Sequence, residues 1–309
     1  MRYEAVSEYS GAVNGIDSNI TVEREGLRHS GGFVDFSAIK ALRPVSHKVY
    51  IERSNTTEEI GMLGFSYDGF WEELLGAFGD RSLEALFTEE NPIMKCEGEF
   101  SFSGESGRAL IMLFSDSVCI LPQTENARRI PLCFTENIDI DGYIMHLTLD
   151  TGEEYSVGKM GYDTKPFFER TQSAAKKIRE TRKEKLAALT QKPPFEKILL
   201  LRTQSTDYLG TIVKNGRCAV ELFTDEDTAT YLYSFDESED VFLKKLSHAM
   251  EAMGKKREII FLPEEKITEN PLYKMAVVRT PAVSFLRSRC TGRLVHSSRW
   301  EEKLLEFIG

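Results

Sequence analysis

The sequence predicts an α+β protein: two antiparallel β units, each closed by a C-terminal helix, followed by a C-terminal α+β domain. Two observations support this prediction. A pattern of two alternating strands, a polar turn and an aromatic-rich helix occurs twice, in residues 48–78 and 143–174. Residues 195–309 contain strand-like and helix-like runs but do not repeat the pattern. We therefore place domains at residues 1–90, 91–190 and 195–309.

The first copy shows each part of the pattern clearly. Val49 and Ile51 share one face because side chains alternate along a strand. Asn55 begins a polar turn, and Asp68 is placed to cap a helix by accepting bonds from free N–H groups. Apolar residues then recur at helical spacing and predict one buried stripe, made of Phe70, Trp71, Leu74, Leu75 and Phe78.

The second copy has the same parts. Met145, Leu147 and Leu149 alternate, and residues 150–152 form a turn. Pro166 suits an early helical position, and the apolar stripe is Phe168, Thr171, Ala175 and Ile178.

Two further matches join the copies. We align Tyr67-Asp68 with Tyr162-Asp163, an interval of 162 − 67 = 95 residues. Upstream, residues 33–42 resemble residues 129–140. Both predict a strand, then a short polar stretch, then a segment that begins with isoleucine.

Several antiparallel strands closed by one amphipathic helix resemble the pleckstrin-homology-like (PH-like) superfold, including its bacterial and GRAM-type members. The resemblance covers residues 1–180 in two copies and depends on pattern rather than on invariant residues. It implies two β-barrels, each with a helix over its open end, because that helix hides apolar side chains and strand edges. The alternative is two unrelated β-plus-helix domains whose similarity arose by chance.

Composition limits the classes of partner. The net charge of −10 and the pI near 5.2 argue against general binding to nucleic acid or an anionic membrane. We find no signal peptide and no apolar run long enough to span a bilayer. The five cysteines form no C-x-x-C pair, which favours buried thiols in a reducing, cytoplasmic setting.

The C-terminal domain has its own predicted elements. A helix capped by Asp236 or Ser238 ends at Gly254. Strands follow at residues 258–262 and 275–278. A short helix runs from Pro281 to a stop at Gly292. A capping box of Ser298 and Glu301 begins the terminal helix.

A search for chemistry finds no phosphate-binding loop, zinc motif or nucleophile motif, and the five histidines are scattered. We therefore expect no catalytic residue, no metal and no cofactor. PH-like domains that bind phosphoinositides do so through basic residues around the first strand-to-strand loop. The matching residues here, SGAVNGIDSN (10–19) and SGESG (103–107), contain no lysine or arginine, and Arg108 alone follows them. This argues against phosphoinositide binding.

One basic cluster lies near the end of the chain, and its members are Arg279, Arg287, Arg289, Arg293, His296 and Arg299. Arginine suits bidentate recognition of carboxylate or phosphate, so the cluster is our candidate anion site. The alternative is that these arginines pair with acids of the same chain.

The leading hypothesis is a non-enzymatic protein-interaction scaffold that binds protein partners through sheet edges or grooves. A second hypothesis is an anion-binding module that uses the arginine cluster. A third is an enzyme with a deep pocket in the C-terminal domain or between domains. The sequence leaves the oligomeric state open.

Overall fold

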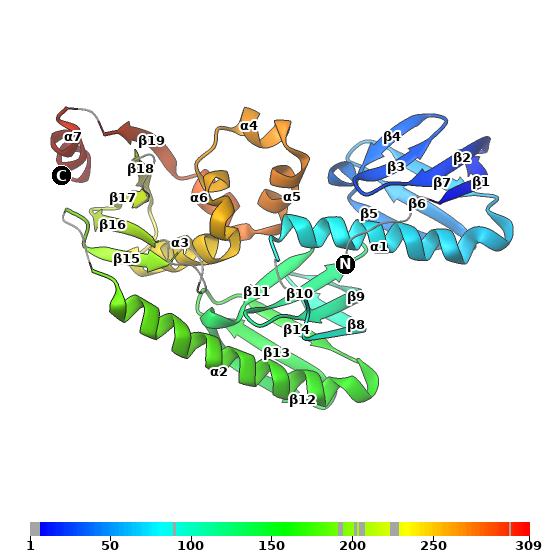
Figure 1. Ribbon diagram of the computed structural model, residues 1–309, viewed down its shortest axis with the longest axis horizontal. Coiled ribbons are helices and arrows are strands. Elements are labelled where there is room, and N and C mark those ends of the chain that lie inside the picture. The colour runs from blue at the N-terminus through cyan, green and yellow to red at the C-terminus, as the bar shows by residue number, and fades with distance from the viewer. Residues whose placement is uncertain are drawn as a thin grey trace.

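The computed structural model describes residues 7–88, 91–190, 194–200, 203, 208–222, 229–296 and 298–309. It combines helices with three antiparallel sheets, two of seven strands and one of five. We call residues 7–88 the first unit, 91–190 the second unit and 194–309 the C-terminal domain. Figure 1 shows the first unit at upper right, the second below it and the C-terminal domain at left.

The elements of the first unit are β1 (Glu8–Val13), β2 (Ile16–Val22), β3 (Gly26–His29), β4 (Gly32–Asp35), η1 (Phe36–Ala38), β5 (Ala41–Val45), β6 (Lys48–Glu52), β7 (Thr57–Gly61), η2 (Gly64–Ser66) and α1 (Tyr67–Ala85). Those of the second unit are β8 (Met94–Phe102), β9 (Glu105–Leu113), β10 (Ser117–Pro122), β11 (Arg128–Pro131), η3 (Leu132–Phe134), β12 (Thr135–Asp141), β13 (Ile144–Leu149), β14 (Glu154–Gly158), η4 (Gly161–Asp163) and α2 (Thr164–Ala188).

The elements of the C-terminal domain are β15 (Lys197–Leu200), β16 (Tyr208–Lys214), β17 (Arg217–Leu222), β18 (Ala229–Ser234), α3 (Glu239–Met253), η5 (Gly254–Ile260), α4 (Glu264–Glu269), α5 (Pro271–Arg279), α6 (Pro281–Arg287), β19 (Cys290–Val295) and α7 (Trp300–Ile308). The predicted domain boundaries near residues 88–92 and 191–194 fall partly or wholly outside the described residues. The sequence also predicts strands at residues 198–201, 209–213, 218–223 and 228–233, and the ends at 201, 223 and 228 lie outside the described residues too.

The two seven-stranded sheets have the same strand order. The first reads β4-β3-β2-β1-β7-β6-β5 and the second β11-β10-β9-β8-β14-β13-β12. In each unit the first strand therefore lies in the middle, between the second strand and the last. Each sheet has two edge strands, so backbone bonds among the described residues do not close it into a ring.

The strand pairing corrects the sequence alignment of the helices. Phe70 and Phe167 are the fully buried aromatics in the first turns of α1 and α2, and they are 167 − 70 = 97 residues apart, not 95. Tyr67 is the first residue of α1, whereas Tyr162 lies in the preceding turn η4. The shared Tyr-Asp dipeptide therefore occupies different positions in the two units. The match of residues 33–42 to 129–140 agrees with the pairing.

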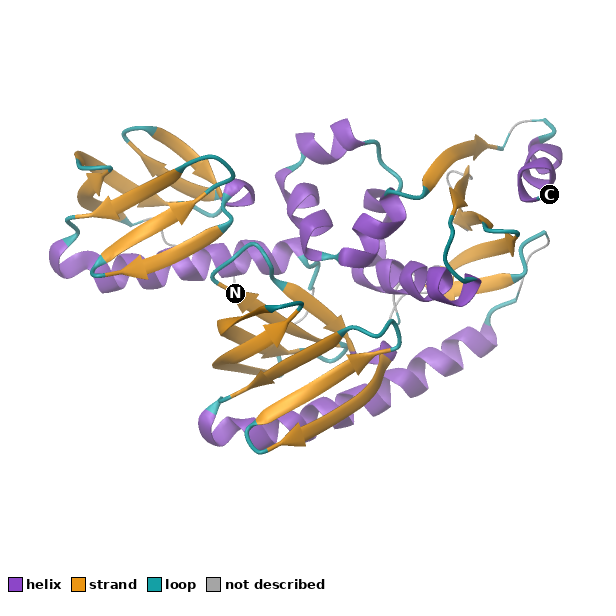
Figure 2. Cartoon of the chain, turned by 180° about the vertical axis from the view of Figure 1, so that it is seen from behind, coloured by secondary structure: helices purple, strands orange, loops and turns teal. Residues whose placement is uncertain are grey.

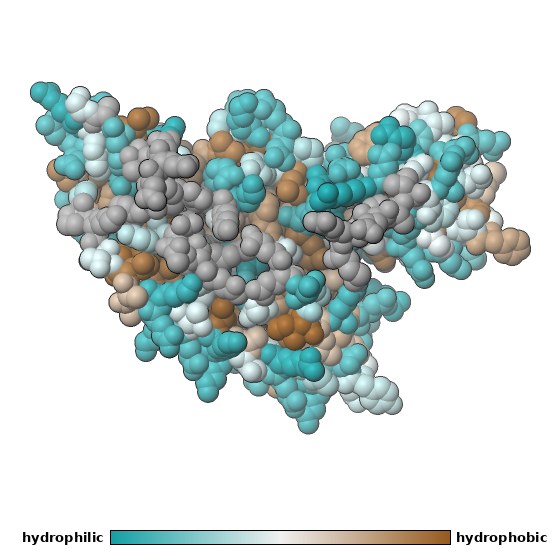
Figure 3. Space-filling view, in the orientation of Figure 1, coloured by the Kyte–Doolittle hydropathy of each residue, from teal (hydrophilic) through white to brown (hydrophobic). Residues whose placement is uncertain are grey.

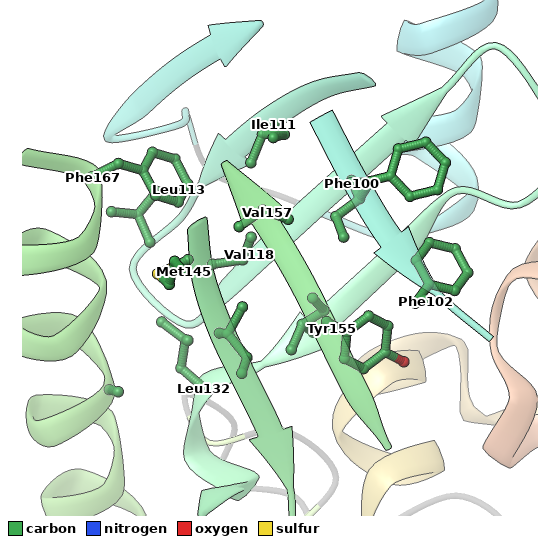
Figure 4. Packing of buried hydrophobic residues seen from close by; sticks show 14 of the residues in the cluster. Phe100, Phe102, Ile111, Leu113, Val118, Leu132, Met145, Tyr155, Val157 and Phe167 are labelled. Atoms are coloured by element: carbon green, nitrogen blue, oxygen red, sulfur yellow. The ribbon is translucent and has the colours of Figure 1, made fainter. Parts of the chain in front are cut away.

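Both helices bury one face in their own sheet. In the first unit Phe70, Leu74 and Phe78 enter the core formed by the strands. In the second, Phe167 and Ala175 do so, and Figure 4 shows Phe167 pointing from α2 into the cluster beside Leu113. Trp71 and Phe168, which the sequence places in the same stripes, are only partly buried and pack beside these cores. The apolar stripe of each helix is thus what holds it on the sheet.

Two glycines make the same close backbone approach in the two units. A Cβ on Gly11 would lie 2.9 Å from the carbonyl oxygen of Gly61, and one on Gly98 would lie 2.6 Å from that of Gly158. In both units the central strand therefore passes close to the end of the last strand, and only glycine permits this approach.

Alanine substitutions at four glycines should divide into two groups. Gly76 and Gly79 lie inside α1 with no atom within 4 Å of an added Cβ. Gly76→Ala and Gly79→Ala should each raise the free energy of unfolding by up to about 1 kcal/mol, because alanine favours helix. Gly11→Ala and Gly98→Ala should lower it, since the new methyl group meets a carbonyl oxygen. Denaturant unfolding measures both, and a loss of stability at Gly76 would contradict the open helix face.

In the C-terminal domain, the five strands follow chain order, β15-β16-β17-β18-β19. Cys218 and Val220 of β17 face α3, whereas Ala219 between them faces α7. The sheet is therefore covered on both faces. Figure 2 shows α7 apart from the other helices, beyond the sheet.

Two predicted strands of this domain are helical. Residues 258–262 form the end of η5 and the turn after it, and residues 275–278 lie within α5. A short buried apolar run has the same composition in a strand and in a helix, so the pattern did not separate them. The missed signal is Asn270, whose side chain caps α5 by accepting bonds from the backbone N–H groups of Leu272 and Tyr273.

Several predicted helix ends also change. Gly292 lies inside β19, and α6 ends earlier, at Arg287. The residue before α7 is Arg299, in a left-handed conformation, and no side chain caps that helix. Asp68 lies in the first turn of α1 and makes no capping bond. Ser238, by contrast, caps α3 as predicted.

Direct contacts join the three parts. Residues of the β10–β11 loop pair with the edge of β5: Leu42 N donates to Gln123 O, and Glu125 N donates to Lys40 O, both at 2.8 Å. The end of α1 packs against β9 and β10 through a small apolar cluster that includes Leu86. The second unit and the C-terminal domain meet around the buried carboxylate of Glu251. No helix in the described part of the chain is long and apolar enough to cross a bilayer.

Candidate interaction surfaces

Arg287 of the predicted cluster is an internal structural residue. Its Nη1 donates to the carbonyl oxygens of Ile259 at 2.7 Å and Leu262 at 2.6 Å, and its Nη2 lies 2.8 Å from Glu264 Oε2. The side chain is 11% exposed. It therefore ties η5 and α4 to the end of α6.

Arg279 is buried, and no carboxylate of a described residue is in contact with it. It is 3% exposed, and its nearest described acceptors are Met275 O at 3.3 Å and Ser82 Oγ at 3.5 Å. Burial lowers the pKa of its guanidinium to about 10, and Glu125 opposes that shift. The side chain lies where α5 meets α1, so it faces the first unit rather than solvent.

The remaining arginines contact different neighbours. Arg289 pairs with Glu237 and lies 4.4 Å from the centre of the Phe285 ring. Arg293 lies over the Tyr231 ring at 5.7 Å. Arg299 pairs loosely with Glu302 at 3.9 Å. The five arginines come from five different helices, strands or loops, and those contacts do not point them toward one common centre.

Substitutions at Arg287 and Arg279 should have opposite consequences. Arg287→Met leaves two carbonyl oxygens without their donor, and each such buried group costs about 1–3 kcal/mol. Arg279→Met removes a buried charge and keeps an apolar stem, so the free energy of unfolding should stay equal or rise. Thermal and denaturant unfolding of both variants check this. Equal losses in the two would contradict the assignment.

His296 lies in a polar group on the sheet of the C-terminal domain. Its Nε2 lies 2.9 Å from Thr230 Oγ1 and 3.4 Å from Glu221 Oε2, and its ring stacks on Trp300 at 3.7 Å. A catalytic triad needs the acid on one ring nitrogen and the nucleophile on the other. In the described contacts the same nitrogen, Nε2, lies near both the hydroxyl and the carboxylate, which differs from the triad arrangement.

A groove of about 370 Å³ separates α1 from β8, β9 and β10 of the second unit. Its walls are mainly apolar, with Trp71 and Leu75 on the helix side and Leu121 on the sheet side. Lys95 and Glu72 are among its few charged residues. Its described lining contains no histidine, cysteine or serine. In the rest of the described chain, too, no group of three metal-ligating side chains is found.

The first strand-to-strand loop of each unit, where phosphoinositide-binding PH-like domains carry basic residues, is short. The β1–β2 connection is the two-residue turn Asn14-Gly15, and most of residues 10–19 belongs to the strands. The β8–β9 connection is Ser103-Gly104. Arg108 lies in β9, 3.9 Å from Glu97, and both side chains are more than four-fifths exposed. The expected absence of a basic loop follows from the sequence itself.

The most exposed aromatic side chains occupy the same place in both units. Phe65 has a relative exposure of 110% and Tyr162 of 103%, and they are 162 − 65 = 97 residues apart, the interval that separates Phe70 from Phe167. Each lies in the turn between the last strand and the helix. We call residues 62–66 and 159–163 the aromatic tips. In Figure 1 the starts of α1 and α2 both lie toward the right of the molecule.

The backbone of each tip directs its ring outward. Leu63 and Met160, two residues before the aromatic, are buried and anchor the turn. The residues before these anchors, Met62 and Lys159, have positive φ values of 57° and 54°. A positive φ is strained for a residue with a side chain, so the surrounding fold holds the turn in place.

The signal for the tips was present in the sequence. The motif G-x-[LM]-G-[FY] occurs at residues 61–65 and again at 158–162. It lies inside both of the repeated stretches. The two-residue error in the helix alignment placed Tyr162 opposite Tyr67 and so hid its match to Phe65.

The charges beside the tips are mixed: Asp68 and Asp163 are acidic, whereas Lys165, at the position equivalent to Asp68, is basic and lies 3.9 Å from Glu169. Asp68 and Asp163 follow the aromatic residues, and neither forms an ion pair with any described residue. Lys159 is the one basic residue within the tips, and its Nζ is held 2.7 Å from Glu99 Oε2. Asp163 lies within the second tip, and Asp68 follows the first tip by two residues, so each exposed ring has a carboxylate close to it along the chain.

Comparison with family models and with curated proteins finds no match to this chain.

Proposed function

We propose that the chain is a non-enzymatic interaction protein whose two seven-stranded units are PH-like domains in tandem. The shared strand order and the single helix after the last strand support this reading of the fold. So does the matching approach of Gly11 to Gly61 and of Gly98 to Gly158.

The observation that carries the proposal is the repeated aromatic tip. Burying a phenylalanine or tyrosine ring removes about 150–250 Å² of surface from water and is strongly favourable. Both units hold such a ring fully exposed at the same position, close to a residue with a strained backbone. Neither unit therefore gains the free energy that burial of its ring would provide. A binding partner restores it. On the face drawn in Figure 3, the hydrophobic residues that the structure describes lie in patches among hydrophilic ones.

The chemistry of the tips defines the partner. The carboxylates of Asp68 and Asp163 repel an anionic membrane and attract basic side chains. The partner we propose is a protein that offers apolar pockets with lysine or arginine at their rims. Because the chain has two tips, binding through both gains from the high effective concentration of the second.

Affinity capture from the native cell tests this function. The baits are the full chain, the variant Phe65→Ser/Tyr162→Ser, and a control that changes two exposed apolar residues elsewhere, Ile16→Ser/Leu305→Ser. We expect a specific protein to be captured by the first and the control and lost with the tip variant. The purified partner should then bind less tightly as salt rises. A chain that captures no specific protein, or a tip variant that captures the same ones, overturns the proposal.

A further inference from the structure

The groove between α1 and the second unit has the size and the walls of a small-molecule site. Such sites enclose about 300–1,000 Å³, are mainly apolar and carry a few polar groups. The volume here is about 370 Å³, and the strands β8, β9 and β10 form the wall opposite α1. Figure 1 and Figure 2 both show α1 lying between the sheet of the first unit and these strands. A ligand in the groove would therefore contact both units.

Contacts on either side hold the two walls of the groove apart. The first half of α1 is anchored in its own sheet by Phe70 and Leu74, whereas its end packs on the second unit through Leu86. Gln123 belongs to the lining, and its carbonyl oxygen accepts a bond from the backbone N–H of Leu42 in the first unit. The helix therefore cannot move down onto the sheet and close the groove without breaking one of these contacts.

Two glycines leave space in the helix wall. Gly76 and Gly79 both line the groove, and a Cβ added at either position would have no neighbouring atom within 4 Å. Glycine is among the least stable residues inside a helix. A larger side chain at these positions would stabilise α1 and fill the groove. The sequence instead has glycine at both, and binding sites commonly retain such destabilising residues.

The charges around the groove favour a positively charged ligand. Each basic residue of the lining has an acid nearby. Arg108 lies 3.9 Å from Glu97. Burial raises the pKa of the partly buried Asp80 carboxyl, and the charge of Lys95 opposes that rise. Glu72 of the helix wall is exposed and forms no ion pair with a described residue. The charge left to be matched is therefore negative.

We propose that the groove binds a small amphipathic cation, which has an apolar body and one ammonium group. The body lies against Leu75 and Leu121, in the space that the two glycines leave. The ammonium group lies at Glu72 and against the neighbouring indole of Trp71, because indole is the best aromatic partner for a cation. This inference is independent of the proposed function, since neither aromatic tip lines the groove.

Three probes with one apolar body and different charges test the class of ligand: phenylbutylamine, phenylbutanol and phenylbutyrate. Each is titrated into the full chain at neutral pH and followed by nuclear magnetic resonance. The chain has two tryptophans, so the indole N–H signal of Trp71 reports on the groove and that of Trp300 is the control. We expect the amine to shift the Trp71 signal alone and to bind about tenfold more tightly than the alcohol. The carboxylate should bind more weakly than the alcohol.

Two outcomes of this titration overturn the proposal. One is that the amine does not shift the Trp71 signal at any concentration at which it is soluble. The other is that the three probes bind with equal affinity, because the charge of the ligand then plays no part.

Variants locate the site. Gly76→Leu/Gly79→Leu fills the groove with side chains that favour helix, so its melting temperature should equal or exceed that of the wild type while binding of the amine is lost. The matched control, Gly69→Leu, lies on the same helix outside the groove, also with no atom near an added Cβ, and should bind as the wild type does. Glu72→Gln should lose most of the preference for the amine over the alcohol. Unchanged binding in the leucine double variant, or an unchanged preference in Glu72→Gln, contradicts the proposed site.

Discussion

Replacing Glu251 with alanine is expected to lower the free energy of unfolding by about 3–5 kcal/mol, because it leaves the partners of a buried ion pair without their counter-charge. Glu251 is fully buried in α3. Its Oε2 accepts bonds from Arg182 Nη1 at 3.3 Å and from the backbone N–H of Thr203 at 2.9 Å. Arg182 belongs to α2, so the pair joins the second unit to the C-terminal domain.

Other contacts make this junction cooperative. Arg129 of β11 donates to the main-chain oxygen of Glu251 at 3.2 Å and pairs with Asp116 at 2.8 Å. One face of the Phe134 ring stacks on His248, with centroids 4.1 Å apart, and the guanidinium of Arg182 also lies over that ring. A substitution at Glu251 should therefore loosen the docking of the whole domain, in addition to weakening α3.

The matched control for this prediction is Glu239→Ala on the same helix. Glu239 pairs with Lys197 at the surface, and both side chains are about half exposed. Exposed pairs contribute less than about 1 kcal/mol, so its loss should be small. Chemical denaturation followed by tryptophan fluorescence and circular dichroism measures both variants. Similar losses for Glu251→Ala and Glu239→Ala would show that the junction is not the buried network described.

The second large effect is expected at the two equivalent aromatics, Phe70 and Phe167. Each is fully buried, and truncation to alanine should cost about 3–5 kcal/mol through lost burial and the cavity left behind. The same change at Phe65 or Tyr162, five residues earlier in each unit, should shift stability by no more than about 0.5 kcal/mol. In both units, therefore, an exposed aromatic residue is followed five residues later by a buried one.

Unfolding of these four alanine variants checks the prediction directly. A large loss at Phe70 with none at Phe167 would contradict the equivalence of the two helices. A large loss at Phe65 or Tyr162 would mean that the ring is packed, and the tips would no longer be available as binding elements.

Much of the two β units could be predicted from the sequence, because their strands alternate strictly and are bounded by turns. Val49 and Ile51, and equally Met145 and Leu147, are buried on one face as the period of two requires. The helical stripes after them were also recognised. The register of the helices was not, because a chance Tyr-Asp dipeptide outweighed the buried Phe70 and Phe167.

The C-terminal domain was harder to predict for a physical reason. Ile259 and Met275 are buried in helical turns whose apolar runs are too short to reveal a period. Ile259 packs in the cluster around α3, so tertiary contacts decide its conformation. For α5, which contains Met275, the capping by Asn270 leaves a local trace in the sequence. The arginine cluster was predicted from residues that are close in the sequence. In the structure these arginines contact different neighbours and do not form one site.

The central claim is that the two units repeat one architecture, and backbone contacts test it most directly. Nuclear Overhauser contacts in a deuterated sample should link Ala12 to Gly61 in the first unit and Glu99 to Gly158 in the second. Both contacts at these positions are the predicted result. A contact in one unit alone, or a second-unit contact displaced along β14, would contradict the repeated architecture on which the tips and their proposed partner depend.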